Sequence, residues 1–181
     1  HALDIVQWGL GTDDTGPVEV WAESANYNAR LTYRYVNGVM LHIGFPPELA
    51  EASAAGKKGA PEEEMPAFGG VFYGERGRLF EHRGRFNTIP IALSQGPLPS
   101  DAVRVYKSDH HFQNWIDCIK SRQQPAADVE IGHRACTVCH LGGIARKLGR
   151  KLRWDPEREI FPGDDEANAC LDRPQRKPYQ L

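Results

Sequence analysis

This chain has no long apolar run, few cysteines and a net charge close to zero. No stretch approaches the roughly twenty apolar residues that a membrane-spanning helix needs, so we expect no membrane partner. Four cysteines among 181 residues are too few for a disulfide-rich scaffold. The net charge is −2 with both signs interspersed, which argues against nucleic acid as a partner. The cytoplasm is the default expectation for location.

A phosphate-binding glycine loop is also missing. Gly9-Leu10-Gly11 neither follows a predicted strand nor precedes a predicted helix, so it lacks the context of a dinucleotide fingerprint. We therefore expect no cofactor-binding residue in this chain.

The composition that remains is that of a globular protein. Hydrophobic residues make up 40% of the chain and charged residues 25%, and the length suits one domain over residues 1–181. Helical spacing of Leu3, Val6 and Leu10 predicts a helix over residues 2–10. Further on, residues 45–68 are rich in Ala, Gly, Pro and Glu, and this composition predicts a surface loop.

Alternating polar and apolar residues predict strands on both sides of that loop. Asn37-Gly38 is a strong hairpin signal and predicts that its flanking strands are antiparallel neighbours. The strands are expected over residues 18–22, 31–35, 39–44, 70–73 and 78–82, with a further extended piece at 86–93 and a short strand at 151–154.

Helices follow in the last seventy residues. An apolar stripe, made by Phe112, Trp115, Ile116 and Ile119, predicts a helix that Ser108 or Asp109 caps. A second helix is expected over 129–148, where Gly142-Gly143 should cost about 1 kcal/mol per glycine against alanine and so indicates close approach to a sheet. A short last helix is expected over 164–171. The order predicts an α+β fold, an open, mostly antiparallel sheet with helices packed on one face.

The alternation also assigns side chains to the two faces of the first strands. Trp21, Arg34, Met40 and His42 should share the face opposite Val20, Leu31, Leu41 and Ile43. A sheet face with tryptophan and methionine is unusually apolar for solvent, so it predicts a homo-oligomer that forms through this face.

The segment Cys136-Thr-Val-Cys139-His140 matches the attachment pattern of c-type haem. Covalent haem needs export and an apolar pocket, and neither Met40 nor Met65 lies in a plausible haem-binding loop. Zinc bound by this segment and Cys118 is an open alternative, because cysteines three apart share a helix face. Free cysteines are more often small buried hydrophobes, so we expect structural cysteines and no metal site.

His1 and Asp4 are the first candidates for chemistry, since residues three apart share one turn of a helix. A histidine beside a carboxylate can move protons near neutral pH, although most such pairs are plain surface pairs.

Two motifs of this chain, His1-Ala-Leu-Asp4 with Trp8 and a tail with GRKLRWDP and GDDEAN, resemble the glucose–fructose oxidoreductase and inositol dehydrogenase (Gfo/Idh/MocA) family. The second half of family members opens with D-x-G-x-H-x-x-D and a tryptophan-containing helix, and His1-Ala-Leu-Asp4 with Trp8 is similar to the end of that motif. The tail is similar to one bacterial branch, with GRKLRWDP at 149–156 and GDDEAN at 163–168.

The resemblance implies that the chain is a fragment of a two-domain enzyme without its dinucleotide-binding half. It would then be the substrate-binding and oligomerisation half of an oxidoreductase for a sugar, cyclitol or related polyol. NAD or NADP would be bound mainly by the missing half. His1 would be catalytic and move the hydroxyl proton together with a lysine of that half, and Asp4 would orient substrate.

The resemblance also implies that loops near the later helices approach substrate, which makes His110, His111 and His133 substrate-binding candidates. Local caps or ion pairs, for example Asp128 with Arg134, are the simpler interpretation of these residues. Two other functions stay open: glycoside cleavage assisted by bound NAD, and a non-catalytic domain for assembly or ligand binding.

Overall fold

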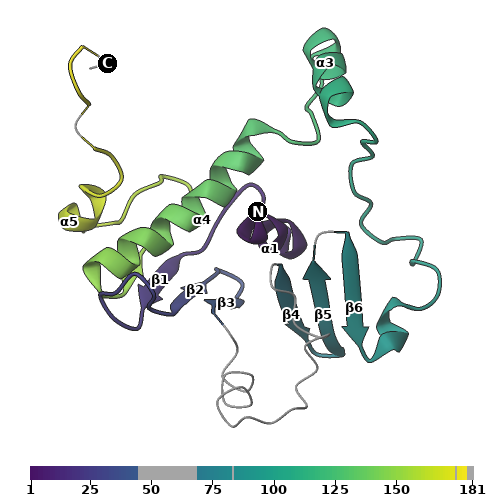
Figure 1. Ribbon diagram of the computed structural model, residues 1–181, viewed down its shortest axis with the longest axis horizontal. Helices are drawn as coiled ribbons and strands as arrows, with labels where there is room; N and C mark the ends of the chain where they lie inside the picture. The colour runs from purple at the N-terminus through teal and green to yellow at the C-terminus, as the bar shows by residue number, and fades with distance from the viewer. Residues whose placement is uncertain (45–68, 83, 174, 179–181) are drawn as a thin grey trace.

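The computed structural model describes residues 1–44, 69–82, 84–173 and 175–178. The predicted loop at 45–68 therefore lies outside the described residues. The described elements form two antiparallel sheets with helices beside them, as Figure 1 shows. In chain order they are α1 (Ala2–Leu10), β1 (Glu19–Ala22), β2 (Leu31–Arg34), β3 (Met40–Ile43), β4 (Gly70–Gly74), β5 (Gly77–His82), β6 (Arg85–Ile89), η1 (Ile91–Ser94), α3 (His111–Ser121), α4 (Val129–Leu148), β7 (Leu152–Arg153) and α5 (Asp165–Asn168).

The first sheet has the order β3-β2-β1-β7, and every pair in it is antiparallel. The hairpin predicted at Asn37-Gly38 is confirmed, because β2 and β3 pair across it and Gly38 has a φ of 86°, in the left-handed region that favours glycine. The Asn37 side chain accepts a hydrogen bond from the Val39 amide and so stabilises the turn.

The second sheet has the order β4-β5-β6. The strands predicted at 70–73 and 78–82 are confirmed as β4 and β5, which pair antiparallel as a hairpin. The fold is α+β and antiparallel as expected, but the described strands divide into two sheets and do not form one. Between β3 and β4 the chain passes through residues that the structure does not describe, and no pairing joins these two strands among the described residues.

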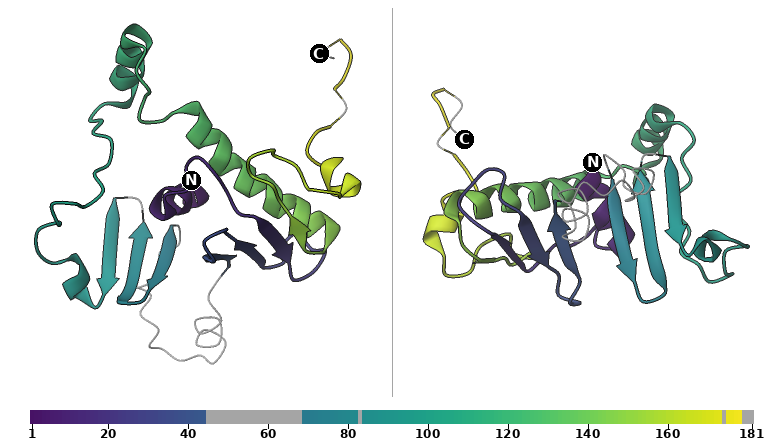
Figure 2. Two further views of the ribbon diagram at one scale, coloured as in Figure 1. Left: turned by 180° about the vertical axis from the view of Figure 1, so that it is seen from behind. Right: turned by 60° about the horizontal axis from the view of Figure 1, so that its bottom comes forward.

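The core lies between the first sheet and α4, as Figure 2 shows from two sides. Strand alternation turns Val20, Leu31 and Tyr33 toward the helix, and all three are buried. From α4, Val138, Leu141 and Ala145 pack against them. These paired faces hold the helix across the sheet.

Gly142 brings α4 closest to the sheet. A Cβ atom added there would meet the Tyr33 hydroxyl and would lie 2.7 Å from Leu31 Cδ1. The Tyr33 hydroxyl itself donates a 3.1 Å hydrogen bond to the Val138 carbonyl. A Cβ at Gly143 would meet nothing within 4 Å. The predicted close approach is therefore confirmed for Gly142 and wrong for Gly143, which faces outward.

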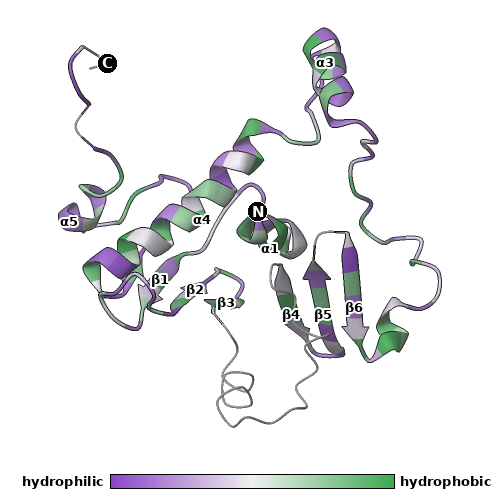
Figure 3. Ribbon diagram, viewed as in Figure 1, coloured by the Kyte–Doolittle hydropathy of each residue, from purple (hydrophilic) through white to green (hydrophobic). Residues whose placement is uncertain are grey.

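Helix α3 stands apart from the two sheets (Figure 1). The predicted helix is confirmed, but the predicted caps are wrong. His110 is the N-cap, and its Nδ1 accepts a 3.2 Å hydrogen bond from the Gln113 amide. A ring nitrogen of histidine takes the place of the usual hydroxyl or carboxylate oxygen, because it can also accept a hydrogen bond from the first helical turn. Figure 3 shows hydrophobic and hydrophilic bands alternating along α3.

Candidate functional site

The start of α1 presents His1 and Asp4 to solvent. Both residues are exposed, and they lie on one turn of the helix. The His1 carbonyl accepts the first helical hydrogen bond from the Ile5 amide at 3.0 Å, which fixes the backbone of the histidine. Within the described chain, the His1 imidazole has no hydrogen bond or ion pair of its own. Its ring is therefore available to a ligand.

A buried polar network fixes the other end of α1. Gln7 donates through Nε2 to the carbonyls of Thr12 and Thr15 at 2.9 and 3.0 Å. Its Oε1 accepts a 2.6 Å hydrogen bond from the Tyr35 hydroxyl. Because Gln7 is buried and all these groups are satisfied, the network ties α1 to the segment after it and to the end of β2.

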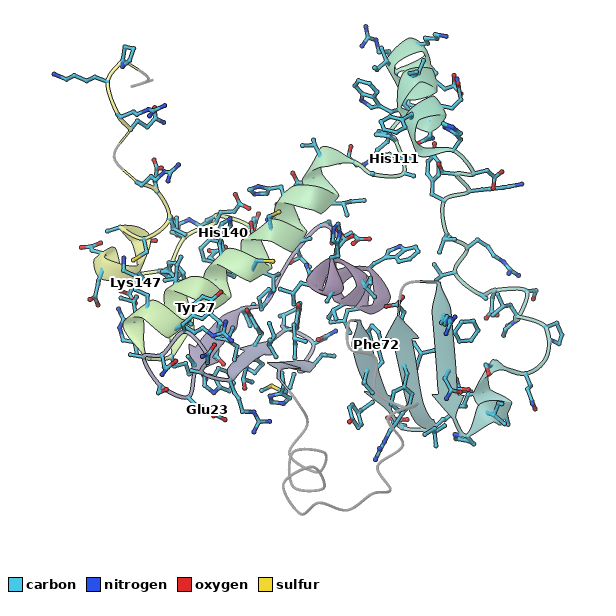
Figure 4. All side chains as sticks on the ribbon, in the orientation of Figure 1. Glu23, Tyr27, Phe72, His111, His140 and Lys147 are labelled. Atoms are coloured by element: carbon cyan, nitrogen blue, oxygen red, sulfur yellow. The ribbon has the colours of Figure 1, made fainter. Side chains whose placement is uncertain are left out.

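Two glycines bring α1 against the second sheet. A Cβ at Gly9 would lie 2.6 Å from the Phe72 ring, and a Cβ at Gly70 would lie 3.4 Å from Val6 Cγ2. Figure 4 shows Phe72 on the side of β4 that faces α1. Helix α1 therefore lies between the two sheets, and these contacts hold its second half from both sides.

Helix α4 packs against α1 and carries two cysteines in its middle. Partial burial raises the pKa of the Cys139 thiol above its ordinary value, and the neighbouring Cys136 raises this pKa further. His140 lies on the side of α4 away from α1 in Figure 4.

An acidic residue near Asp4 was not predicted from the sequence. Burial raises the pKa of the Asp13 carboxyl above its ordinary value, and the negative charges of Asp4 and Asp14 raise this pKa as well. The buried Oδ1 of Asp13 has no hydrogen-bond partner in the described part of the chain. The fold brings Asp13 back toward Asp4 because the chain reverses direction at Gly11, whose φ is 65°. Sequence spacing gave no signal for this proximity.

His110 and His133 are both engaged locally. His110 caps α3 through Nδ1, and His133 Nε2 lies 2.6 Å from Glu159 Oε1. Arg134 binds the same Glu159 carboxylate and also Glu130, at 3.1 and 2.7 Å. The predicted Asp128–Arg134 pair is wrong, because Asp128 instead caps α4 by accepting from the Glu130 amide.

His111 lies in a shallow hollow on α3. The hollow has a volume of about 320 Å³, at the small end of the range for ligand sites. Six residues line it: His111, Phe112, Asn114, Trp115, Pro125 and Ala127. The Asn114 amide is already engaged with the Tyr106 hydroxyl and the Ala126 amide, so His111 supplies the open polar group. Figure 4 marks its position at the base of α3.

The structure brings His1 and Asp4 together but does not bring the later histidines to them. Helix α3 stands apart from α1 in Figures 1 and 2, so His111 and His1 do not line one hollow. Binding of substrate by Asp4, His110, His111 and His133 stays a prediction.

The cysteines of the CxxCH segment lie in the middle of α4. Cys136 and Cys139 are both exposed, so the expectation that they are buried hydrophobes is wrong. They fall on the edges of the buried stripe because Ala135, Val138 and Gly142 occupy its centre. The buried Cys118 belongs to a different helix, α3. Among the described residues, no group of three or more His, Cys, Asp or Glu side chains is placed to hold a metal ion.

The helix N-termini of the described chain do not suit a dinucleotide pyrophosphate. That group needs several open N–H donors at a helix start and no adjacent negative charge. Helix α4 begins with Asp128 and Glu130, and α1 has Asp4 in its first turn. In α3 the Gln113 amide is taken by His110. None of these three helix starts therefore offers an open site for a pyrophosphate. None of the described helices is long and apolar enough to cross a membrane.

Comparison with known proteins decides the family. A model of the oxidoreductase family C-terminal alpha/beta domain matches residues 73–181, which is more than half of the chain. The chain belongs to the Gfo/Idh/MocA family of oxidoreductases. No curated protein and no solved structure matches it.

The family match agrees with the fold and with one of the two sequence motifs. It covers β5, β6, α3, α4, β7 and α5, and includes the whole GRKLRWDP and GDDEAN tail. The antiparallel sheets and helices are those of an alpha/beta domain of this family. His1 and Asp4 lie outside the matched residues, so their role depends on the geometry of α1 and on the resemblance of the first motif.

Proposed function

We propose that this chain is the substrate-binding and assembly domain of an NAD(P)-dependent oxidoreductase that acts on a sugar, cyclitol or related polyol. Membership of an oxidoreductase family supports the reaction class. The observation that carries the proposal for this chain is the exposed His1 imidazole, with no polar partner in the described structure, on a helix fixed from both sides.

In the proposed reaction, His1 accepts the proton of the hydroxyl group that is oxidised. A neutral imidazole nitrogen is a suitable base near neutral pH, and a positioned base of this kind typically contributes about 10²–10⁴-fold to the rate. The rigid attachment of α1 supports this role, because proton transfer requires the ring to lie within hydrogen-bond distance of the hydroxyl. The role proposed for this chain is transfer of the proton, and binding of the dinucleotide that takes the hydride is assigned mainly to the other half of the enzyme.

Asp4 has a positioning role in this proposal. It lies one turn from His1, and its negative charge stabilises the imidazolium form that results from proton transfer. Carboxylate oxygens also accept hydrogen bonds from sugar hydroxyls, which suits a polyol substrate. Asp13 adds a second carboxyl near Asp4, and its raised pKa means that burial and its acidic neighbours disfavour its charged form.

We also propose that the outer face of the first sheet forms a homo-oligomer. The alternation of the strands gives this face to Trp21, Arg34, Met40 and His42, and Met40 is exposed. Its charges are already paired within the chain: Arg34 and Lys151 both contact the Glu19 carboxylate, at 2.6 and 2.7 Å. A face whose charges are neutralised internally loses less hydration energy when a second copy covers it.

The experiment that tests the proposed reaction is a substrate screen of the enzyme that carries this chain. Sugars, cyclitols and linear polyols are offered with NAD⁺ or NADP⁺, and formation of the reduced nicotinamide is recorded. We expect turnover with at least one polyol and a carbonyl product in equal amount. Release of a free sugar from a glycoside without net cofactor reduction would instead support the glycosidase alternative and contradict the dehydrogenase.

A further inference from the structure

Lys147 and Cys170 form a contact that the proposed function does not use. Lys147 Nζ donates a hydrogen bond to Cys170 Sγ at 3.4 Å, across 23 residues of sequence. Lys147 lies in the last turn of α4, and Cys170 follows α5. Figure 4 shows Lys147 on the part of α4 that faces α5. An amine nitrogen and a thiol sulfur, both nucleophiles, thus lie next to each other near the surface.

Neighbouring contacts hold this pair in place. The Asn168 side chain accepts from the Phe161 amide and donates to the Phe161 carbonyl, both at 2.8 Å. Arg150 makes two hydrogen bonds to the Asp164 carboxylate, at 2.6 and 2.8 Å. Because Phe161 and Ala167 are fully buried, the α5 segment is anchored to the core, and Cys170 is fixed next to the end of α4.

The other described lysines and cysteines lack this arrangement. Lys151 binds the Glu19 carboxylate at 2.7 Å, whereas Lys147 has no ion pair within the described structure. Cys139 and Cys170 each donate to the carbonyl four residues earlier, of Ala135 and Glu166, at 3.4 and 3.5 Å, but only Cys170 also contacts a lysine among the described residues. The buried Cys118 lies next to Tyr106 and Asn114. Cys136 is exposed and has no lysine beside it among the described residues. The chain therefore contains its own controls for the reactivity of a lysine–cysteine pair.

We propose that Lys147 and Cys170 form an oxidative modification site, in which hydrogen peroxide links the two side chains by a sulfur–nitrogen bond. In the first step the Cys170 thiol attacks peroxide, and R–SH plus H₂O₂ gives R–SOH plus water. The sulfur loses two electrons, and the O–O bond breaks. Cys170 is half-buried and so still open to peroxide, and sulfenic acids condense with nitrogen nucleophiles.

In the second step the Lys147 ammonium group first gives one proton to solvent, and the neutral Nζ then attacks the sulfur of the sulfenic acid. The S–O bond breaks as the S–N bond forms, and the leaving hydroxide takes a proton from the attacking nitrogen and departs as water. The product is R–S–NH–R′, and sulfur keeps its oxidation level. The flexible four-carbon chain of lysine lets Nζ move the remaining distance to the sulfur. Holding the two groups together favours this reaction over attack by an external amine.

Two equivalents of a small thiol reverse the link. They restore the Cys170 thiol and the Lys147 amine and leave as a disulfide, so atoms and electrons balance. While it lasts, the link ties the last turn of α4 to the segment after α5 and protects Cys170 from further oxidation to sulfinic acid.

The test uses the 181-residue chain and a low excess of hydrogen peroxide, followed by alkylation of the remaining thiols. We expect a species about 2 Da lighter than the reduced chain before alkylation, with one alkyl group fewer afterwards. Digestion with trypsin should give a cross-linked peptide pair with no cleavage after Lys147. Dithiothreitol should return both peptides to their unmodified masses.

Three variants separate the site from general oxidation. Lys147→Arg keeps the charge but lacks the nucleophilic amine, so its Cys170 should proceed to sulfinic acid or stay open to alkylation. Cys170→Ser should give no cross-link at all. Lys151→Arg is the matched control and should cross-link as the wild-type chain does.

Sulfinic acid at Cys170 in the wild-type chain, with Lys147 still cleaved by trypsin, would overturn the proposal. So would a Cys170 disulfide with another cysteine, or a cross-linked pair about 14 Da heavier, which would retain an oxygen atom between nitrogen and sulfur.

Discussion

Replacing Gly142 and Gly143 one at a time by alanine should change stability in opposite directions. Both glycines lie inside α4, where alanine has the better helix propensity by about 1 kcal/mol. At Gly143 the new methyl group meets nothing within 4 Å, so only the propensity gain applies. We expect Gly143→Ala to stabilise the chain by about 0.5–1 kcal/mol.

At Gly142 the same methyl group meets the sheet. It would lie 2.7 Å from Leu31 Cδ1 and would overlap the Tyr33 hydroxyl. Leu31 can rotate, but Tyr33 is held by its hydrogen bond to the Val138 carbonyl and is fully buried. Overpacking of this kind costs about 1–3 kcal/mol, which exceeds the propensity gain. We therefore expect Gly142→Ala to destabilise the chain by about 1–2 kcal/mol net.

Urea unfolding of the two variants, followed by far-ultraviolet circular dichroism, measures both effects. The midpoint should fall for Gly142→Ala and rise for Gly143→Ala, with similar slopes. If both substitutions raise the midpoint by similar amounts, helix α4 does not approach the sheet at Gly142 and the description of the core is wrong.

Three further predictions follow from other contacts. Tyr35→Phe removes the 2.6 Å hydrogen bond to the buried Gln7 Oε1, which keeps the Thr12 hydroxyl at 3.0 Å, and should lower the free energy of unfolding by about 0.5–1.5 kcal/mol in the same assay; an unchanged value would contradict the network. Hydrogen bonds from Arg34 and, to a smaller extent, from Lys151 hold the pKa of Glu19 at about 2, below its ordinary value of 4.5. The Glu19 carboxylate therefore contributes fully to the free energy of unfolding above pH 4.5, and this contribution is lost as the pH falls through 2. Because both partners are substantially exposed, unfolding titrations should show a loss of at most about 1 kcal/mol that Glu19→Gln abolishes. Sedimentation of the chain should show at least a dimer that Met40→Glu weakens, and a monomer at tens of micromolar would refute the interface.

Local patterns in the sequence were sufficient to predict most of the helices and strands. The bounds of α4 match the predicted 129–148, and alternation assigned Val20 and Trp21 to opposite faces of β1 correctly. These features depend on the spacing of neighbouring residues, which the sequence displays directly. The cap of α3 was missed because histidine is an uncommon N-cap, and the pattern favoured Ser108 and Asp109 instead.

Tertiary placement could not be predicted in the same way. The sequence indicated strands before and after residues 45–68 but not that β3 and β4 belong to different sheets, since strand pairing depends on distant segments. The proximity of Asp13 to Asp4 results from the reversal of the chain after α1, and that of Lys147 to Cys170 results from the return of α5. Neither pair has a characteristic spacing that a sequence motif would reveal.

The turnover number of His1→Ala tests the central claim most directly. In the enzyme that carries this chain, with a polyol and nicotinamide cofactor at saturation, kcat should fall by about 10²–10⁴-fold, while the affinity for the cofactor changes little. His140→Ala is the matched control, because His140 is exposed on the side of α4 away from α1, and its kcat should stay near the wild-type value. Wild-type turnover in His1→Ala would contradict the account, because His1 would then have no part in the proton transfer.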